Sequence, residues 1–350
     1  MPIARAYAAQ SARVPLTPFS MERREPRAHD VLIDILYCGV CHTDLHHARD
    51  EWGVGVFPLV PGHEIVGRVA KAGGAVTRFK VGDAVGVGCL VDSCRDCAPC
   101  RQGEEQFCIP GAVGTYGSRE RDGAPTQGGY STHITVDENY VVRIPESLPL
   151  DRAAPLLCAG ITAYSPLRHY GVKAGDKVAV VGLGGLGHLT VKLAKTMGAE
   201  VTVLSTSPSK RDDALALGAA HFAVTSDTDT FTKLAERFDF VLDTVPAAHD
   251  YNAYLGLLKV DGTMILIGVP THPTPLSAFP LVMRRRKLGG SLIGGIRETQ
   301  EMLDFCAKHD VASDIELIPI QKINEAYERM LKGEVRYRFV IDTASLRAER

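Results

Sequence analysis

The strongest constraint on the fold is a glycine-rich stretch in the second half of the chain, VAVVGLGGLGHLTVKLAKTMG at 178–198. An apolar strand pattern comes first, the spacing G-x-G-x-x-G follows, and a helical pattern comes next. In this context the first glycine permits a tight turn, the second lets the backbone approach a pyrophosphate, and the third lets helix and strand pack. The helix N-terminus also favours an anion. The motif predicts dinucleotide binding, rather than an ordinary glycine-rich turn, at Gly182, Leu183, Gly184, Gly185, Leu186 and Gly187.

From about Ile161 onward, strand-like and helix-like segments alternate along the chain. Helical patterns at 188–199 and 209–219 separate apolar runs that predict strands. This alternation predicts an α/β fold with a doubly wound parallel sheet and helices on both faces. The predicted strands are at 177–184, 201–207, 221–225, 238–245 and 263–269.

The first half of the chain has a different pattern, with short alternating strands broken by Gly, Pro and Asp turns, which predicts an all-β lobe. Two helical patterns and a last strand at 338–343 follow the α/β region. Because 350 residues exceed what one core usually serves, two domains are expected. The predicted strands of the first half are at 31–40, 64–73, 83–89, 130–136 and 139–145, and the late helical patterns are at 299–310 and 323–333.

Charge and hydropathy exclude several classes of protein. The formal net charge is −2, the pI is about 6.6 and the mean hydropathy is zero, as expected of an ordinary globular protein without attraction to nucleic acid or to an anionic membrane. The one dense basic run, Arg284–Lys287, is expected to form a solvated face. The sequence has no apolar segment typical of a signal peptide or a membrane span, so a cytoplasmic location is expected.

Five of the nine cysteines lie between Gly88 and Cys108. Four of them follow the spacing C-x2-C-x2-C-x7-C, which lets thiolates from one loop converge on one ion. The spacing favours a closed tetrahedral zinc site over an iron–sulfur cluster or redox cysteines. Cys89 falls outside the repeat and is expected to be a small buried hydrophobe near that loop. A closed site has no open position for a substrate, so catalysis is expected elsewhere. The four predicted zinc ligands are Cys94, Cys97, Cys100 and Cys108.

The end of the second α/β strand, VTVLSTSPSKR, bears on cofactor choice. A carboxylate there would bind a ribose 2′-hydroxyl and repel a 2′-phosphate, and this segment has none. Hydroxyls and positive charges suit a phosphate better. NADP(H) is therefore favoured over NAD(H), and the predicted phosphate-binding residues are Ser205, Thr206, Ser207, Lys210 and Arg211. For Lys210 and Arg211 the alternative role is a solvated helix start.

Two further stretches, CGVCHTDLHH at 38–47 and PGHEIVGRVAKAG at 61–73, carry a family resemblance. The second resembles the signature of the zinc-dependent medium-chain alcohol dehydrogenases. With PTQGGYSTH, PLLCAGITAY, VGLGGLGHL and RYRFVID, the chain is similar throughout to the cinnamyl alcohol dehydrogenase branch. The resemblance implies a GroES-like β-rich catalytic domain at 1–159 and 298–350, and a Rossmann NADP-binding domain at 160–297.

The resemblance also implies a second zinc, bound by Cys41, His63 and Cys158 with one coordination position open. Individually these residues would be read as a buried thiol or a structural histidine. Asp44 would orient His63, and Glu64 would lie beside the metal. By the same resemblance, Thr43 would contact the substrate oxygen, His46 would relay the proton, His42 and Arg338 would bind the pyrophosphate, and Thr162, Thr244, Gly268, Ser291 and Ile293 would line the nicotinamide site. His47, one residue beyond the relay position, is expected to be a surface histidine.

The function implied is reversible hydride transfer between NADPH and aromatic or medium aliphatic aldehydes and primary alcohols, chiefly as an aldehyde reductase. A homodimer with two zinc ions per chain is expected. The segment at 109–129 lacks the tryptophan that plant members of the branch often carry, which argues against bulky lignin-type alcohols. Two alternatives stay open: zinc-free quinone or enoyl reduction on the same fold, and a non-catalytic NADPH-binding protein.

Overall fold

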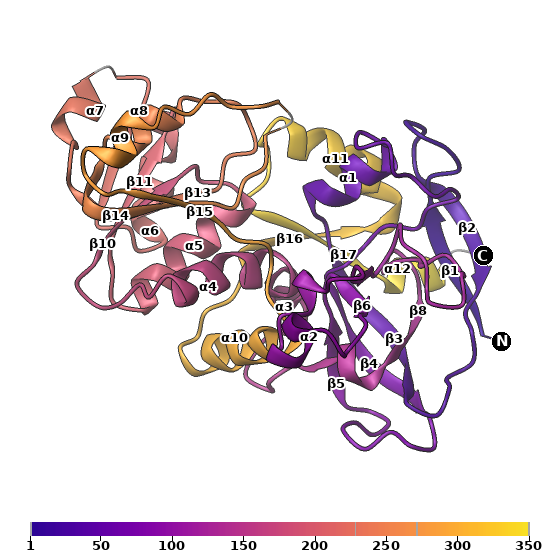
Figure 1. Cartoon of the computed structure of the whole chain (residues 1–350). Coiled ribbons are helices and arrows are strands. Elements are labelled where there is room, and N and C mark those ends of the chain that lie inside the picture. The colour runs from indigo at the N-terminus through magenta and orange to yellow at the C-terminus, as the bar shows by residue number, and fades with distance from the viewer. Residues whose placement is uncertain (1, 228, 271, 349–350) are drawn as a thin grey trace. The chain divides into compact units, whose positions relative to one another are not determined.

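The computed structural model describes residues 2–227, 229–270 and 272–348 (Figure 1). The chain divides into two compact units, each with its own sheet and core. Unit 1 comprises Met1–Ile161 and Gly294–Arg350, and unit 2 comprises Thr162–Ile293. In the described part of the chain, no helix has both the length and the apolar character needed to cross a membrane.

A parallel sheet forms the centre of unit 2, with the strand order β12-β11-β10-β13-β14-β15 (Figure 1). Chain order runs outward from β10 in both directions, which is the doubly wound arrangement predicted from the sequence. The direction changes between β10 and β13, and ligands bind at such switch points, beyond the carboxyl ends of the strands. The strands are β10 (Lys177–Val181), β11 (Glu200–Ser205), β12 (His221–Val224), β13 (Phe238–Asp243), β14 (Leu258–Leu266) and β15 (Lys287–Gly290).

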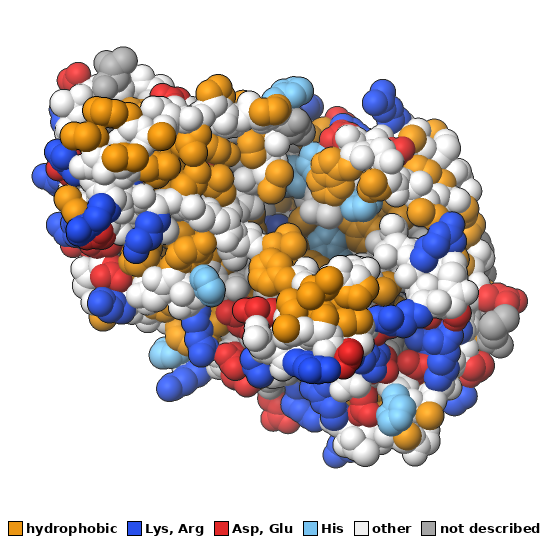
Figure 2. All heavy atoms as spheres, in the orientation of Figure 1, with side chains coloured by type: hydrophobic (Ala, Val, Ile, Leu, Met, Phe, Trp, Pro, Cys, Tyr) orange, Lys and Arg blue, Asp and Glu red, His pale blue; other side chains and the backbone are white. Residues whose placement is uncertain are grey.

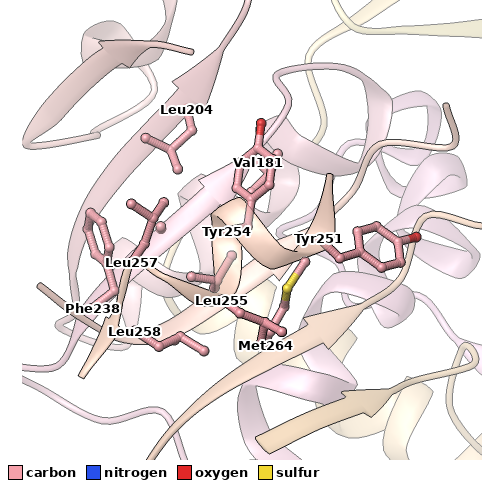
Figure 3. Packing of buried hydrophobic residues seen from close by; sticks show 11 residues of the cluster. Val181, Leu204, Phe238, Tyr251, Tyr254, Leu255, Leu257, Leu258 and Met264 are labelled. Carbon is pink, nitrogen blue, oxygen red and sulfur yellow. The ribbon is translucent and has the colours of Figure 1, made fainter. Parts of the chain in front are cut away.

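Helix α8 packs on this sheet through an apolar cluster (Figure 3). Tyr251, Tyr254 and Leu255 of α8 meet strand side chains that include Val181 and Phe238. Burial of each such side chain contributes about 1.5–3 kcal/mol, so the cluster is a major source of stability for unit 2. Helix α4 (Ala159–His169) begins in the last residues of unit 1 and continues in unit 2. The other helices of unit 2 are α5 (Gly185–Thr196), η4 (Pro208–Lys210), α6 (Arg211–Ala216), α7 (Asp229–Lys233), α8 (Tyr251–Leu255) and α9 (Phe279–Val282).

Unit 1 is built on a mostly antiparallel sheet, with the order β16-β17-β3-β4-β5-β9 and with β8 paired to β3. The central pair β3 and β4 is held in register by partners such as Cys38 and Ile65. The C-terminal strand β17 joins the sheet beside β3, so the end of the chain returns to the sheet of unit 1. The strands are β3 (Asp30–Gly39), β4 (Ile65–Ala72), β5 (Ala84–Val87), β8 (His133–Asp137), β9 (Val142–Arg143), β16 (Ile315–Pro319) and β17 (Arg338–Asp342).

Two small ribbons and several short helices complete unit 1. Helices α10 and α11 confirm the two late helical patterns of the sequence. The ribbons are β1 (Ile3–Ala8) with β2 (Thr17–Glu22), and β6 (Leu90–Asp92) with β7 (Val113–Gly114). The helices are α1 (His42–Ala48), α2 (Ala98–Gln102), η1 (Glu105–Phe107), η2 (Glu138–Tyr140), α3 (Leu150–Ala153), η3 (Ala154–Leu157), α10 (Ile296–Lys308), η5 (Ile320–Lys322), α11 (Ile323–Leu331) and α12 (Ala344–Ala348).

The prediction for the basic run was wrong at one position. Arg284 and Arg285 are exposed to solvent to a large extent, but the Arg286 side chain is only 6% exposed. Its guanidinium donates to the backbone carbonyls of Leu258 and Gly256, at 2.8 and 3.3 Å. Arg286 therefore ties the start of β15 to the strand beside it, and only part of the run is a solvated face.

Candidate active site and metal centres

The four cysteines of the regular repeat converge in unit 1. Their sulfur atoms all lie within 4.8 Å of one another. Cys97 precedes α2, and Cys100 lies within it, while the short helix η1 returns the chain to Cys108. Backbone N–H groups of Cys97 and Asp96 donate to the sulfur of Cys94, and these hydrogen bonds lower the pKa of that thiol to about 6. A set of four sulfurs with one thiol already favouring the thiolate fits a closed tetrahedral zinc site.

A second cluster joins Cys41, His63, Glu64 and Cys158, with ligand atoms that also lie within 4.8 Å of one another. Cys41 lies just beyond the end of β3 and His63 just before the start of β4. Because β3 and β4 are antiparallel neighbours in which Cys38 faces Ile65, these two residues meet at the same edge of the sheet.

Cys158 reaches the cluster from η3, which packs against β5. A Cβ at Gly86 would lie 2.8 Å from a methyl carbon of Leu157, and one at Gly88 would lie 2.8 Å from the Leu157 carbonyl oxygen. These contacts are too close for a side chain at either position, so glycines there allow η3 to approach the strand. Hydrogen bonding with Cys158 lowers the pKa of Cys41 well below its usual value, which favours a thiolate ligand.

Asp44 holds His63 in place from the side opposite the cluster. The Asp44 carboxylate is fully buried, and its Oδ1 lies 3.2 Å from Nδ1 of His63, which leaves Nε2 for a metal. The other donors to this carboxylate are the backbone N–H of Gly62 at 3.0 Å, that of Cys41 at 2.8 Å and the Tyr130 hydroxyl at 3.1 Å. Four donors fix the orientation of the carboxylate.

Glu64 pairs with Arg338, and both side chains are buried. Nη2 of Arg338 donates to Oε1 of Glu64, while Oε2 has no hydrogen-bond partner among the described residues. A Cβ at Gly39 would overlap Oε2, so glycine is required there. Burial raises the pKa of Glu64, and the charge of Arg338 opposes that rise. Nε of Arg338 likewise lacks a partner within the described chain, so this arginine keeps a donor for an anion.

Helix α1 carries the other residues that the resemblance assigned near the metal. His42 and Thr43 form its first turn, next to Cys41. His46 lies one turn on, and its Nδ1 is 2.5 Å from Oε2 of Glu51. The His46 ring also lies 5.1 Å from that of Trp52, centroid to centroid. Sequence reasoning missed Glu51, which gives the His46 proton an acceptor on the solvent side.

Two sequence interpretations need correction at this site. Cys89 was expected near the four-cysteine loop, but it hydrogen-bonds with Cys158, and this contact lowers its pKa. His47 was expected on the surface, but it is half-buried, with its ring 5.2 Å edge-on from that of Tyr116. Tyr116 in turn stacks on the His63 ring at 5.5 Å, and no local sequence signal pointed to it. Both errors arise because the neighbours come from distant segments.

In unit 2, the glycine turn lies at the switch point of the sheet. Gly182 has a φ of +88°, and a Cβ there would lie 2.7 Å from a methyl carbon of Val245. A Cβ at Gly187 would lie 2.3 Å from the Gly182 carbonyl oxygen, so helix and turn pack as the motif predicts. Thr244, at the end of β13, donates from its hydroxyl to Val181 at 2.7 Å. The turn therefore shows, at Gly182 and Gly187, the close packing for which the motif requires glycine.

The end of β11 lies beside this turn. Nζ of Lys210 donates to the Leu183 carbonyl at 3.0 Å, which links the predicted phosphate-binding residues to the glycine turn. The Arg211 guanidinium lies 5.2 Å from the centroid of the Phe222 ring. Ser205 is buried, whereas Thr206 is exposed and Ser207 half-buried.

The remaining predicted cofactor residues lie elsewhere in unit 2. Gly268 approaches the backbone of Val245, where a Cβ would lie 2.6 Å from the carbonyl carbon and oxygen. Thr162 is buried in α4, and Ser291 and Ile293 follow β15. The close approach to Val245 explains why glycine occupies position 268, and the positions of the four residues do not by themselves assign them a cofactor role.

The chain matches two family models: the alcohol dehydrogenase GroES-like domain over residues 27–146 and the zinc-binding dehydrogenase over residues 185–308. It is 62% identical to NADP-dependent alcohol dehydrogenase C 1 of Mycolicibacterium smegmatis, over 98% of this chain and 99% of that protein. A probable formaldehyde dehydrogenase of Bacillus subtilis is 55% identical, with 98% of each chain covered.

Among solved structures, a cinnamyl alcohol dehydrogenase of Sorghum bicolor superposes with a TM-score of 0.97 at 46% identity, over 100% of both chains. A Helicobacter pylori homologue, solved as a complex with NADP(H), has a TM-score of 0.92 at 44% identity, over 98% of both chains. The chain therefore belongs to the zinc-binding alcohol dehydrogenases, in the cinnamyl alcohol dehydrogenase branch. This confirms the predicted family and the predicted fold class.

Proposed function

We propose that this protein is a zinc-dependent, NADP(H)-linked alcohol dehydrogenase that works chiefly as an aldehyde reductase. Its substrates would be aromatic or medium aliphatic aldehydes and the corresponding primary alcohols. The observation that carries the proposal is the convergence of Cys41, His63 and Cys158 from three distant segments on one point of unit 1. The relatives named as NADP-dependent alcohol dehydrogenase and cinnamyl alcohol dehydrogenase support the same reaction class.

The donor set fits zinc at both clusters. Two thiols and an imidazole match a catalytic site with one open position, and four thiols match a closed structural site. In the proposal Cys41, His63 and Cys158 hold the catalytic ion, and the unpaired buried oxygen of Glu64 lies next to it. A zinc ion bound there supplies a Lewis acid that polarises the substrate oxygen. Asp44 keeps the His63 ring oriented, so the geometry of the site does not depend on the ion alone.

The residues of α1 would handle the proton of the substrate hydroxyl. In the proposal Thr43 contacts that hydroxyl, and His46 passes the proton between the cofactor ribose and solvent. The 2.5 Å contact between His46 and Glu51 supports this, because the carboxylate can hold the proton that the imidazole releases. The proposal includes a relay because hydride is transferred at carbon, while the hydroxyl proton must move separately between the substrate and solvent.

For the cofactor, we propose that the pyrophosphate binds at Gly182–Gly187, with His42 and the free donor of Arg338 as further contacts. The 2′-phosphate would lie at the end of β11, among the hydroxyls and the two cations there. The absence of a carboxylate at this strand end in the sequence supports NADP(H) over NAD(H). The nicotinamide would be lined by Thr162, Thr244, Gly268, Ser291 and Ile293.

Replacing Arg211 with glutamine is expected to raise the KM for NADPH about tenfold or more and to leave the KM for NADH unchanged. The reason is that a charge-assisted hydrogen bond to the 2′-phosphate, worth about 1.5–3 kcal/mol, is lost only with the phosphorylated cofactor. Steady-state kinetics with both cofactors measure the effect. Lys233→Gln, an exposed cation on α7 of the same unit, is the control. Equal loss with both cofactors, or comparable wild-type kinetics with NADH and NADPH, would contradict the phosphate assignment.

We further propose a cytoplasmic homodimer with a catalytic domain of residues 1–159 and 298–350 and a Rossmann domain of residues 160–297. An exposed hydrophobic group in unit 2 supports association (Figure 2). Phe279 is 70% and Val282 74% exposed on α9, and Met283 follows at 53%. The adjacent strand β15 pairs on one side only within the described sheet. Light scattering of the purified protein is expected to give about twice the chain mass, and a monomer at micromolar concentration would refute this.

The experiment that tests the function is a kinetic panel of aldehydes and alcohols against NADPH and NADH, with zinc-loaded protein. The proposal predicts NADPH oxidation with aromatic and medium aliphatic aldehydes, and slower oxidation of the corresponding alcohols. Metal analysis of the same preparation is expected to find two zinc ions per chain. No NADPH oxidation with any aldehyde would favour a binding protein instead, and at most one zinc per chain would favour quinone or enoyl reduction.

A further inference from the structure

A cavity in unit 1 is lined by none of the sulfur-cluster residues. It has a volume of about 320 Å³ and lies between the segment after β2, the strands β6 and β8, and the loop around Arg121. Its described lining contains five arginines and four carboxylates, a net charge of +1 with its histidine neutral. The arginines are Arg23, Arg24, Arg27, Arg95 and Arg121.

The carboxylates of this cavity are engaged by its own arginines. Asp30 is paired with Arg24, which also lies 3.3 Å from Glu120. Asp92 and Asp137 are both paired with Arg95, at 2.9 and 3.0 Å. Arg27 is paired with Asp122 at 2.5 Å and lies 3.6 Å from Glu120, and Arg121 shares Asp92 with Arg95. Among the described residues, Arg23 is therefore the one arginine of the lining without a carboxylate at ion-pair distance.

Arg23 is the buried member of the set, with 9% of its surface exposed. Its terminal nitrogens donate to two carbonyls, of Gln127 and Gly128 at 2.7 Å each, and to the Ser131 hydroxyl at 2.9 Å. None of these acceptors is a carboxylate, and Nε has no acceptor among the described residues. Burial accordingly lowers the pKa of this guanidinium to about 9. A buried cation with an unused donor is costly unless an anion approaches it.

Arg121 supplies donors from the exposed rim of the same cavity. Its Nε lies 2.9 Å from Oδ2 of Asp92, and its side chain is 55% exposed. No interaction of its two terminal nitrogens is found within the described chain, so this edge of the guanidinium is available. Two N–H groups on one edge of an arginine suit the bidentate capture of an oxyanion.

We propose that this cavity is a binding site for a phosphate group, held by the guanidinium of Arg23 at its buried end and by the terminal nitrogens of Arg121 at its rim. A tetrahedral phosphate has enough oxygens to serve both arginines, whereas a carboxylate would use its two oxygens on one of them. Binding to the folded state alone would stabilise unit 1 by mass action. The site is separate from the cofactor phosphates, which the proposed function places at other residues.

The test uses the full-length, zinc-loaded protein saturated with NADP⁺, so that the cofactor's own phosphate sites are filled. Inorganic phosphate is titrated at constant ionic strength by calorimetry and by thermal unfolding. We expect saturable binding of about one phosphate per chain and a Tm that rises with its concentration. Arg121→Gln is expected to weaken this binding about tenfold or more. Arg68→Gln, an exposed arginine on β4 outside the cavity, is expected to leave it unchanged.

The proposal is overturned if phosphate shows no saturable binding under these conditions, or if Arg121→Gln and Arg68→Gln bind it equally well. Arg23→Met is the second variant and is expected to abolish binding. If it does not fold, Arg121→Gln still decides the outcome. Glycerol phosphate, titrated in parallel, distinguishes an organic phosphate from the free ion as the ligand. If it binds more tightly than inorganic phosphate, the site is assigned to an organic phosphate. If it binds more weakly, the site is assigned to the free ion.

Discussion

Replacing Cys158 with alanine is expected to abolish aldehyde reduction, with kcat/KM lowered by about a thousandfold or more. The thiol belongs to the buried cluster with Cys41 and His63, and its loss would leave two ligands where a catalytic zinc site needs three. Lewis-acid stabilisation of the transition state is worth several kcal/mol, and each 1.4 kcal/mol corresponds to a factor of ten. Steady-state kinetics together with metal analysis check this prediction, and zinc is expected to fall from two to one per chain.

The matched control is Cys306→Ala. Cys306 is also fully buried in unit 1, but it lies in α10 against Met302 and in neither sulfur cluster. The Cys306→Ala substitution is expected to lower the stability of the protein modestly, without changing kcat or the zinc content. NADPH binding by Cys158→Ala, measured by fluorescence, is expected to persist because the glycine turn belongs to the other unit. Near-normal turnover by Cys158→Ala would show that the cluster is not the catalytic centre.

Replacing Cys97 with alanine is expected to destabilise the protein by at least about 3 kcal/mol, which corresponds to a Tm lower by roughly 6–12 °C. Four sulfurs within 4.8 Å of one another organise the loop from Cys94 to Cys108, and losing one would release the ion that they share. Thermal unfolding and zinc analysis measure the effect, and wild-type protein stripped by a chelator is expected to unfold at an equally low or lower temperature.

Asp96→Ala is the control for this variant, because Asp96 lies in the same loop with 84% of its side chain exposed and carries no ligand atom. Its Tm is expected to stay within a degree or two of wild type. A Cys97→Ala protein that keeps both the wild-type Tm and two zinc ions would contradict the structural-zinc assignment.

The four-cysteine loop and the glycine turn were predictable from the residues alone because their chemistry is local. The sulfurs of Cys94 to Cys108 come from one loop, and the turn at Gly182 needs only a strand before it and a helix after it. Spacing of this kind can be recognised in the sequence without knowledge of how the rest of the chain folds.

The cluster of Cys41, His63 and Cys158, proposed as the catalytic zinc site, was accessible only through the family resemblance. Cys41 and His63 meet because Cys38 and Ile65 are register partners, and Cys158 joins them by the docking of η3. For the same reason Tyr116 and Tyr130 escaped sequence reasoning, because the fold alone brings them to His63 and Asp44. Glu51 lies only five residues from its partner His46, but no motif marked it. Cys89 was misplaced because its nearest sulfur in sequence is not its nearest in space.

The strands missing from the sequence prediction also depend on their partners. β15 reads KLGG, which has no β-branched residue and two glycines, and it is a strand because it pairs with the end of β14. β16 is a short segment ending in proline, and its place is set by pairing with β17. The conformation of such edge strands depends more on pairing within the sheet than on the intrinsic β-propensity of their residues.

The central claim is most directly tested by following the hydride itself. NADPH deuterated at the transferred position is incubated with zinc-loaded protein and cinnamaldehyde, a probe with both a carbonyl and a conjugated double bond, and the product is analysed by NMR. The proposal predicts cinnamyl alcohol with deuterium on the carbinol carbon. A saturated aldehyde carrying deuterium at its β-carbon, or no deuterated product at all, would contradict it.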